Sequence, residues 1–152
     1  MTQRLEKDFS KSFHNNIKLM GHKLQVNQMA HHETHSDYEL FNKKGYIFFI
    51  EAKECKVSEK GYGVFAFDRL TQEGKLLDYH QFAHNMYSYL LISFRKKRLK
   101  DSYTFLIPIT KYISFKNSIG KKSGNLNDFM NNFSQFRLKV LIGSMYDLIP
   151  LE

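Results

Sequence analysis

Asp37, Glu51 and Lys53 are the residues of this chain whose types and spacing are best suited to chemistry. Glu51 and Lys53 follow the apolar run 46–50, and in an extended strand the side chains at positions i and i+2 point to the same face. Asp37 precedes Glu51 by one short polar turn. Two carboxylates can hold a cation, while an adjacent ammonium group can bind a phosphate or orient an attacking water. The pattern therefore predicts a metal-assisted site for phosphate chemistry.

The element that must position these residues is a β-hairpin, predicted over residues 37–41 and 46–53 with a turn at 42–45. A four-residue turn would place Asp37 opposite Ile50, beside Glu51. A one-residue bulge would place the two acids directly across from each other. Either register brings Asp37 and Glu51 close together.

An amphipathic helix is predicted over residues 4–20, with Gly21 as its end and a short strand within 23–28. The helix prediction depends on apolar residues at helical spacing, namely Leu5, Phe9, Phe13, Ile17 and Met20.

Further along, strands are predicted at 64–67, 87–94 and 103–109, with Pro108 placing the last one near a sheet edge. The spacing of Asp78 and Gln81 predicts a helix that begins near Tyr79, and a second amphipathic helix covers 126–136. The expected fold is an α/β domain with a mixed sheet flanked by helices, formed by residues 1–152 as one unit.

Composition and charge narrow the classes of function. The chain has 152 residues, 42% of them hydrophobic, which argues against disorder. Its formal net charge of +8 suits a polyanionic partner such as nucleic acid. Cys55 is the only cysteine, which excludes an intrachain disulfide, and we interpret it as a small apolar filler. No apolar run approaches the length of a membrane span, so a soluble, cytoplasmic protein with no membrane partner is expected.

The histidines do not predict a zinc site. His31, His32 and His35 lie close together, and His80 and His84 are spaced by one helical turn. There is no second cysteine, and the pair His80/His84 lacks the glutamate of zinc-protease motifs. Contact with DNA or solvent is the expected role of the cluster that includes His35.

Taken in order, these segments resemble RecU, a family of Holliday-junction resolvases among the PD-(D/E)xK nucleases, whose fold is restriction-endonuclease-like. Five features carry the resemblance: the N-terminal helix with Glu6, the segment 36–38, the strand that ends at residues 51–54, His80-Gln81 before a hydrophobic strand, and the segment 120–123 ahead of the last helix. RecU proteins carry a longer insertion, a stalk that enters the junction, where this chain has only residues 29–36. The segment after His80 is also shorter than in the family.

The resemblance implies a set of roles for the candidate residues. Asp37, Glu51 and the carbonyl of Ala52 would bind Mg²⁺, with Mn²⁺ as an alternative, and Glu6 would complete the acidic cluster. Lys53 would orient or deprotonate the water or hold the phosphate, and Gln81 would brace the site. The residues expected to contact the DNA backbone are Arg95, Lys96, Lys97, Arg98, Lys100, Lys121, Lys122 and Ser123, with Arg69 and Lys75 as weaker candidates of the same kind.

Each candidate residue also has a purely structural interpretation. Asp37 could cap a turn, Glu51 and Lys53 could form an exposed ion pair, and Glu6 could be the acid favoured in the first turn of a helix. Gln81 could belong only to a capping box.

The expected function is resolution of four-way DNA junctions by a homodimer, because symmetric nicks need two active sites related by a dyad. The resemblance also implies branch-migration or recombinase proteins as partners. Two alternatives stay open: a nuclease of the same fold acting on flaps, nicks or restriction sites, and a catalytically silent DNA-binding or architectural protein.

Overall fold

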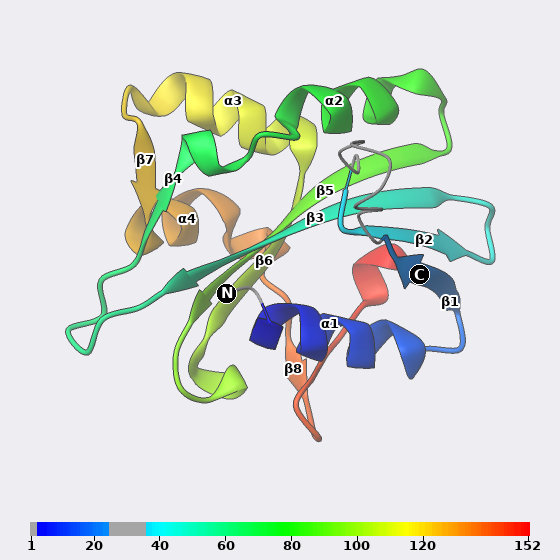
Figure 1. The fold of residues 1–152 in the computed structure, drawn as a ribbon, viewed down its shortest axis with the longest axis horizontal. Helices are drawn as coiled ribbons and strands as arrows, with labels where there is room; N and C mark the ends of the chain where they lie inside the picture. Colours follow the sequence, from blue (N-terminus) through cyan, green and yellow to red (C-terminus); the bar gives the residue numbers. More distant parts are fainter. Residues whose placement is uncertain (1–2, 25–35) are drawn as a thin grey trace, which may run out of the picture.

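A five-stranded mixed sheet is the centre of the computed structural model, which describes residues 3–24 and 36–152 (Figure 1). β3 and β5 are parallel, and the other neighbouring strands are antiparallel. The predicted α/β architecture with a mixed sheet flanked by helices is therefore confirmed. In spatial order the strands are β1 (Leu19–Lys23), β2 (Tyr38–Asn42), β3 (Ile47–Lys56), β5 (Met86–Arg95) and β6 (Tyr103–Pro108).

Helices cover both faces of this sheet (Figure 1). On one face, α1 (Gln3–His14) packs with the C-terminal segment, which contains the hairpin β8 (Val140–Leu141) and β9 (Met145–Tyr146). The other face carries α2 (Glu73–Phe82), α3 (Ile109–Ile119) and α4 (Leu126–Phe133), together with the small sheet of β4 (Val64–Ala66) and β7 (Ser123–Asn125). None of the helices within the described ranges is long and apolar enough to cross a membrane.

The central strand β3 contributes to both hydrophobic cores. Phe48, Ile50 and Ala52 face the α1 side, whereas Phe49 and Cys55 face the side of α2 and α4. This alternation explains why the first part of β3, residues 47–50, is a continuous apolar run, since a strand covered on both faces has no solvated side.

The first helix is shorter than the sequence predicts. It ends at His14, and Ile17 and Met20 are 87% and 76% exposed. Asn15 and Asn16 end it, because their side chains bind the backbone: Asn15 Nδ2 donates to the Lys11 carbonyl and Asn16 Oδ1 accepts from the Lys18 N–H. The strand predicted at 23–28 begins earlier, at Leu19, and residues 25–28 lie outside the described ranges.

One further helix prediction was incomplete, and another helix was not predicted at all. α2 begins at Glu73 rather than near Tyr79, so His80 and Gln81 lie in its last turn instead of opening it. α3 was not predicted, because its apolar residues continue directly from strand β6 without a polar break. The true capping box is Asn125 with Asp128, at the start of α4. The strands predicted near 64, 87 and 103 are present, and β6 with Pro108 is an edge strand.

Gly21 is needed for close packing in β1, not for ending a helix. A Cβ atom at this position would lie 2.2 Å from the Glu39 carbonyl oxygen and 2.8 Å from the Leu40 Cα, both of which are backbone atoms. We therefore expect Gly21→Ala to lower the free energy of unfolding by about 2 kcal/mol through a shift of β1 against β2.

Gly74→Ala is the matched control, because nothing lies within 4 Å of a Cβ built on Gly74 in α2. That change should be neutral or stabilise by about 0.5 kcal/mol. Urea unfolding of both variants measures the difference, and equal stabilities would contradict the packing role of Gly21.

Candidate active site

The β2–β3 hairpin brings Asp37 next to Glu51. Asn42 and Tyr46 close the hairpin, which leaves a three-residue loop in place of the predicted four-residue turn, with Gly45 at φ +84°. The ladder pairs Tyr38 with Ile50, and the Asp37 N–H also donates to the Ile50 carbonyl at 3.0 Å. Asp37 and Tyr38 thus both lie opposite Ile50, as in a β-bulge. Asp37 therefore faces the peptide between Ile50 and Glu51.

Pairing between β2 and β3 stops at this point, although β3 continues to Lys56. Among the described strands, none pairs with residues 52–56 on the β2 side, and we call this stretch the open edge of β3. Asp37 Oδ2 accepts the first N–H of the open edge, that of Ala52, at 2.8 Å. Asp37 therefore does cap a backbone group, and the same bond fixes its carboxylate beside Glu51.

Glu51 and Lys53 form a buried ion pair, not the exposed pair of the structural interpretation. Lys53 Nζ lies 2.9 Å from Glu51 Oε1, and the side chains are 17% and 3% exposed. Burial, and after it the charge of Asp37, raise the pKa of Glu51 to about 7, although the bond with Lys53 acts to lower it. Burial also raises the pKa of Asp37, against the opposing hydrogen bond from Ala52.

Glu6 joins this electrostatic environment from α1. It forms an ion pair with Lys23 of β1, and its charge raises the pKa values of both Asp37 and Glu51. The Tyr38 hydroxyl donates to the Glu6 carbonyl at 3.1 Å and so ties the first turn of α1 to the hairpin. Glu6 is a first-turn acid, as the structural interpretation expects, and it also lies within electrostatic range of the site.

The donor set at this site suits a hard cation. Among residues 3–24 and 36–152, no three His, Cys, Asp or Glu side chains converge closely enough to form a metal-binding group. Asp37 and Glu51 supply two carboxylates, and in a strand the C=O of Ala52 points to the same side as the N–H that Asp37 binds. Mg²⁺ needs only one or two carboxylates and keeps several waters, so these oxygen donors fit it.

One predicted site residue, Gln81, lies apart from this cluster. Gln81 is exposed in the last turn of α2, whose sheet-facing residues are Leu76, which is buried, and Tyr79, whose ring lies 4.7 Å from that of Phe49. Gln81 does not reach the site in this arrangement because it projects from another face of the helix.

Arg95 has a structural role in the folded chain, and its burial gives no support to the predicted DNA contact. It is 8% exposed, and its Nη1 lies 2.6 Å from Asp8 Oδ2, which fastens α1 to β5. The basic run 95–100 therefore begins inside the protein, because β5 extends through its first residue.

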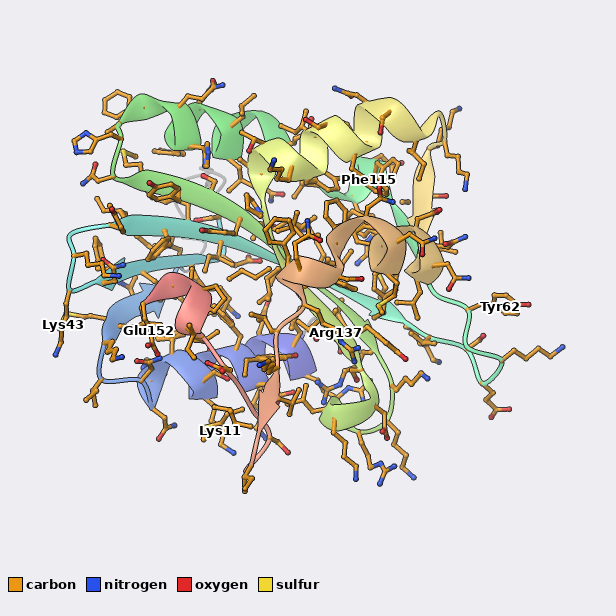
Figure 2. The ribbon with its side chains drawn as sticks, turned by 180° about the vertical axis from the view of Figure 1, so that it is seen from behind. Lys11, Lys43, Tyr62, Phe115, Arg137 and Glu152 are labelled. Atoms are coloured by element: carbon orange, nitrogen blue, oxygen red, sulfur yellow. The ribbon has the colours of Figure 1, made fainter. Side chains whose placement is uncertain are left out.

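The other predicted DNA contacts fall into two groups. In Figure 1 the turn between α3 and β7 lies at the upper left and the β5–β6 loop at the lower left. Arg137, labelled in Figure 2, stacks 4.2 Å from the Tyr103 ring and Lys96 lies 5.6 Å from the same ring, so Arg137 adds to the first group. The first group contains Lys96, Lys97, Arg98 and Lys100, and the second contains the exposed Lys121 and Lys122 with the half-buried Ser123.

The histidines give no second site in the described part of the chain. His80 Nδ1 accepts the Ser88 N–H at 3.0 Å, burial lowers its pKa, and His84 is exposed. The predictions for His31, His32 and His35 and for the shortened stalk fall on residues 29–36, of which only Ser36 lies within the described ranges.

Two basic residues at the site, Lys23 and Arg69, make contacts that the sequence pattern does not predict. Lys23 neutralises Glu6, but this contact depends on the register of β1 against β2, which pairs Lys23 with Tyr38. Arg69 donates to the carbonyl of Glu54 on the open edge, a contact that no local pattern announces.

No protein-family model and no curated protein matches this sequence. The interpretation of the site therefore depends on its own geometry.

Glu51 gives the folded protein a pH-dependent stability. Its pKa is higher in the folded state, about 7, than the ordinary value of 4.5, so the folded state binds more protons between these values. Stability from Glu51 is fully present below pH 4.5 and is lost as the pH rises through 7. We expect the wild type to lose about 2 kcal/mol between pH 5 and pH 8 that Glu51→Gln retains.

Urea unfolding at both pH values measures this difference, with Glu59→Gln on the exposed β3–β4 loop as the control that should follow the wild type. An equal loss of stability in Glu51→Gln and the wild type would show that Glu51 titrates normally.

Proposed function

We propose that this protein is a metal-dependent endonuclease of the restriction-endonuclease-like fold, most specifically a RecU-type resolvase of Holliday junctions. The observation that carries the proposal is the meeting of Asp37, Glu51 and Lys53 where β2 leaves β3. The sheet order, with an antiparallel hairpin beside a parallel strand and helices on both faces, is compatible with that fold.

The chain's own residues divide the chemistry between them. When bound, Mg²⁺ or Mn²⁺ supplies positive charge that polarises the phosphate and lowers the pKa of a bound water. Asp37, Glu51 and the carbonyl of Ala52 would hold this cation, and Glu6 would add negative charge from α1. Lys53, which pairs with Glu51 in the structure, would hold the phosphate or orient the water.

The net charge supports a polyanionic substrate, and the proposal takes this substrate to be DNA with a four-way junction. The net charge of +8 favours a polyanion, and exposed basic residues gather on the β5–β6 loop and on the α3–β7 turn. A junction has two-fold symmetry, so paired nicks require a homodimer with two such sites. Products with 5′-phosphate and 3′-hydroxyl ends belong to the same proposal, as do branch-migration or recombinase proteins as partners.

Asp37→Asn tests the assignment of the site. Asparagine keeps an oxygen that can accept the Ala52 N–H, so the fold of the hairpin should survive while the charge that holds the cation is lost. Cleavage should fall by at least about 1000-fold, equivalent to about 4 kcal/mol of transition-state stabilisation, while DNA binding in EDTA stays the same or improves.

The assay compares a labelled four-way junction with linear duplex, flap and nicked DNA, in Mg²⁺ and in EDTA. Asp78→Asn, an exposed acid on α2, is the control and should cleave like the wild type. Unchanged cleavage by Asp37→Asn would overturn the site, and cutting spread over all the substrates would leave a nuclease without the junction claim. Tight binding without cutting in Mg²⁺ or Mn²⁺ would favour the catalytically silent DNA-binding protein.

A further inference from the structure

We infer that Arg69 binds a backbone phosphate of the cleaved strand, next to the phosphate that Lys53 handles. The inference rests on the proposed nuclease function and adds to it a second phosphate-binding group, located on the open edge of β3.

Three contacts place the Arg69 guanidinium on that edge. Nη2 donates to the Glu54 carbonyl at 3.1 Å, and Nη1 lies 3.6 Å from Cys55 Sγ. The guanidinium carbon also lies 5.4 Å from the centre of the Phe65 ring. The short helix η1 (Phe67–Arg69), which follows β4, delivers the side chain to this position.

The same contacts place Arg69 beside the catalytic candidates. Cys55 and Lys53 are two residues apart in β3, so their side chains leave the same face with a separation of about 7 Å. Arg69 touches Cys55, and the Glu54 carbonyl that it binds lies between the two. The chain thus places two cations in a row along the open edge, which begins at the Asp37 carboxylate.

Within the described part of the chain, Arg69 differs from the neighbouring cations in having no carboxylate partner. Among residues 3–24 and 36–152, Lys53 pairs with Glu51, Lys23 with Glu6 and Arg95 with Asp8, whereas no acidic group lies within 4.0 Å of the Arg69 guanidinium.

Exposure and donor count make Arg69 available to an anion. The residue is exposed, and two of its five N–H groups are enough for the contacts with Glu54 and Cys55. The remaining donors form a planar fork that suits a phosphate, and the bond to Glu54 holds the fork in place before DNA arrives.

The first experiment measures DNA binding against salt concentration. Fluorescence anisotropy with a four-way junction and a linear duplex, in EDTA, compares the wild type with Arg69→Gln and Lys43→Gln. Lys43 is an exposed lysine on the β2–β3 loop, at the far end of the hairpin from Glu51 (Figure 2), so it controls for the loss of one charge. Arg69→Gln should bind about tenfold more weakly and reduce the slope of log K against log salt by about 0.9, while Lys43→Gln changes neither.

The second experiment locates the phosphate. Neutral methylphosphonates replace, one at a time, the three phosphates on each side of the cleavage position. At one position the wild type should lose about tenfold in affinity, and Arg69→Gln should lose nothing further because the contact is already missing. Arg69→Met, which also removes the charge and keeps an apolar side chain beside Phe65, replaces Arg69→Gln if the latter fails to fold by circular dichroism.

The outcomes separate this inference from the proposed function. If the affinity losses from Arg69→Gln and from the methylphosphonate are additive at every position, and the wild type cleaves DNA in Mg²⁺, the role of Arg69 is overturned and the proposed nuclease function stands. A Lys43→Gln variant as defective as Arg69→Gln would also overturn it. A wild type that neither binds nor cleaves any of the DNAs would overturn both.

Discussion

The unequal length of two neighbouring strands is the constraint from which the site follows. β2 starts at Tyr38, while β3 runs on to Lys56 and exposes backbone groups that need partners. Asp37 binds the first N–H of this open edge and Arg69 binds a carbonyl farther along it. The edge therefore binds polar side chains and keeps them in a row along a strand whose neighbouring residues lie in two hydrophobic cores.

The site places charged side chains in a buried position, which is energetically unfavourable. Glu51 is almost fully buried beside Asp37, and Lys53 compensates only part of this unfavourable arrangement. Lys23 plays the same part for Glu6 at the edge of the cluster. Residues that served stability alone would be better replaced by apolar ones, because β3 is covered on both faces. The charged side chain of Glu51 therefore distinguishes its position in β3 from the apolar residues Ile50 and Ala52 on either side.

The hairpin and the central strands could be predicted from the sequence because each is a continuous apolar run with a turn signal, and the proximity of Asp37 and Glu51 follows from chain connectivity alone. The end of α1 could not, because Ile17 and Met20 continue the helical spacing after Asn15 and Asn16 have stopped the helix. The burial of Arg95 could not be predicted either, because it depends on an ion pair with Asp8, which lies 87 residues away in the sequence. The contacts of the site that the hydrophobic pattern cannot predict join side chains to segments that lie far away in the sequence.

The position of Cys55 gives the molecule an intrinsic reporter. It is the only thiol of the chain, it is 2% exposed, and burial raises its pKa to about 11, so at neutral pH it is protonated and shielded from reagents. The Arg69 guanidinium lies against its sulfur. Alkylation of this thiol therefore requires the β3 edge to open, and its rate measures the frequency of that opening without any introduced label.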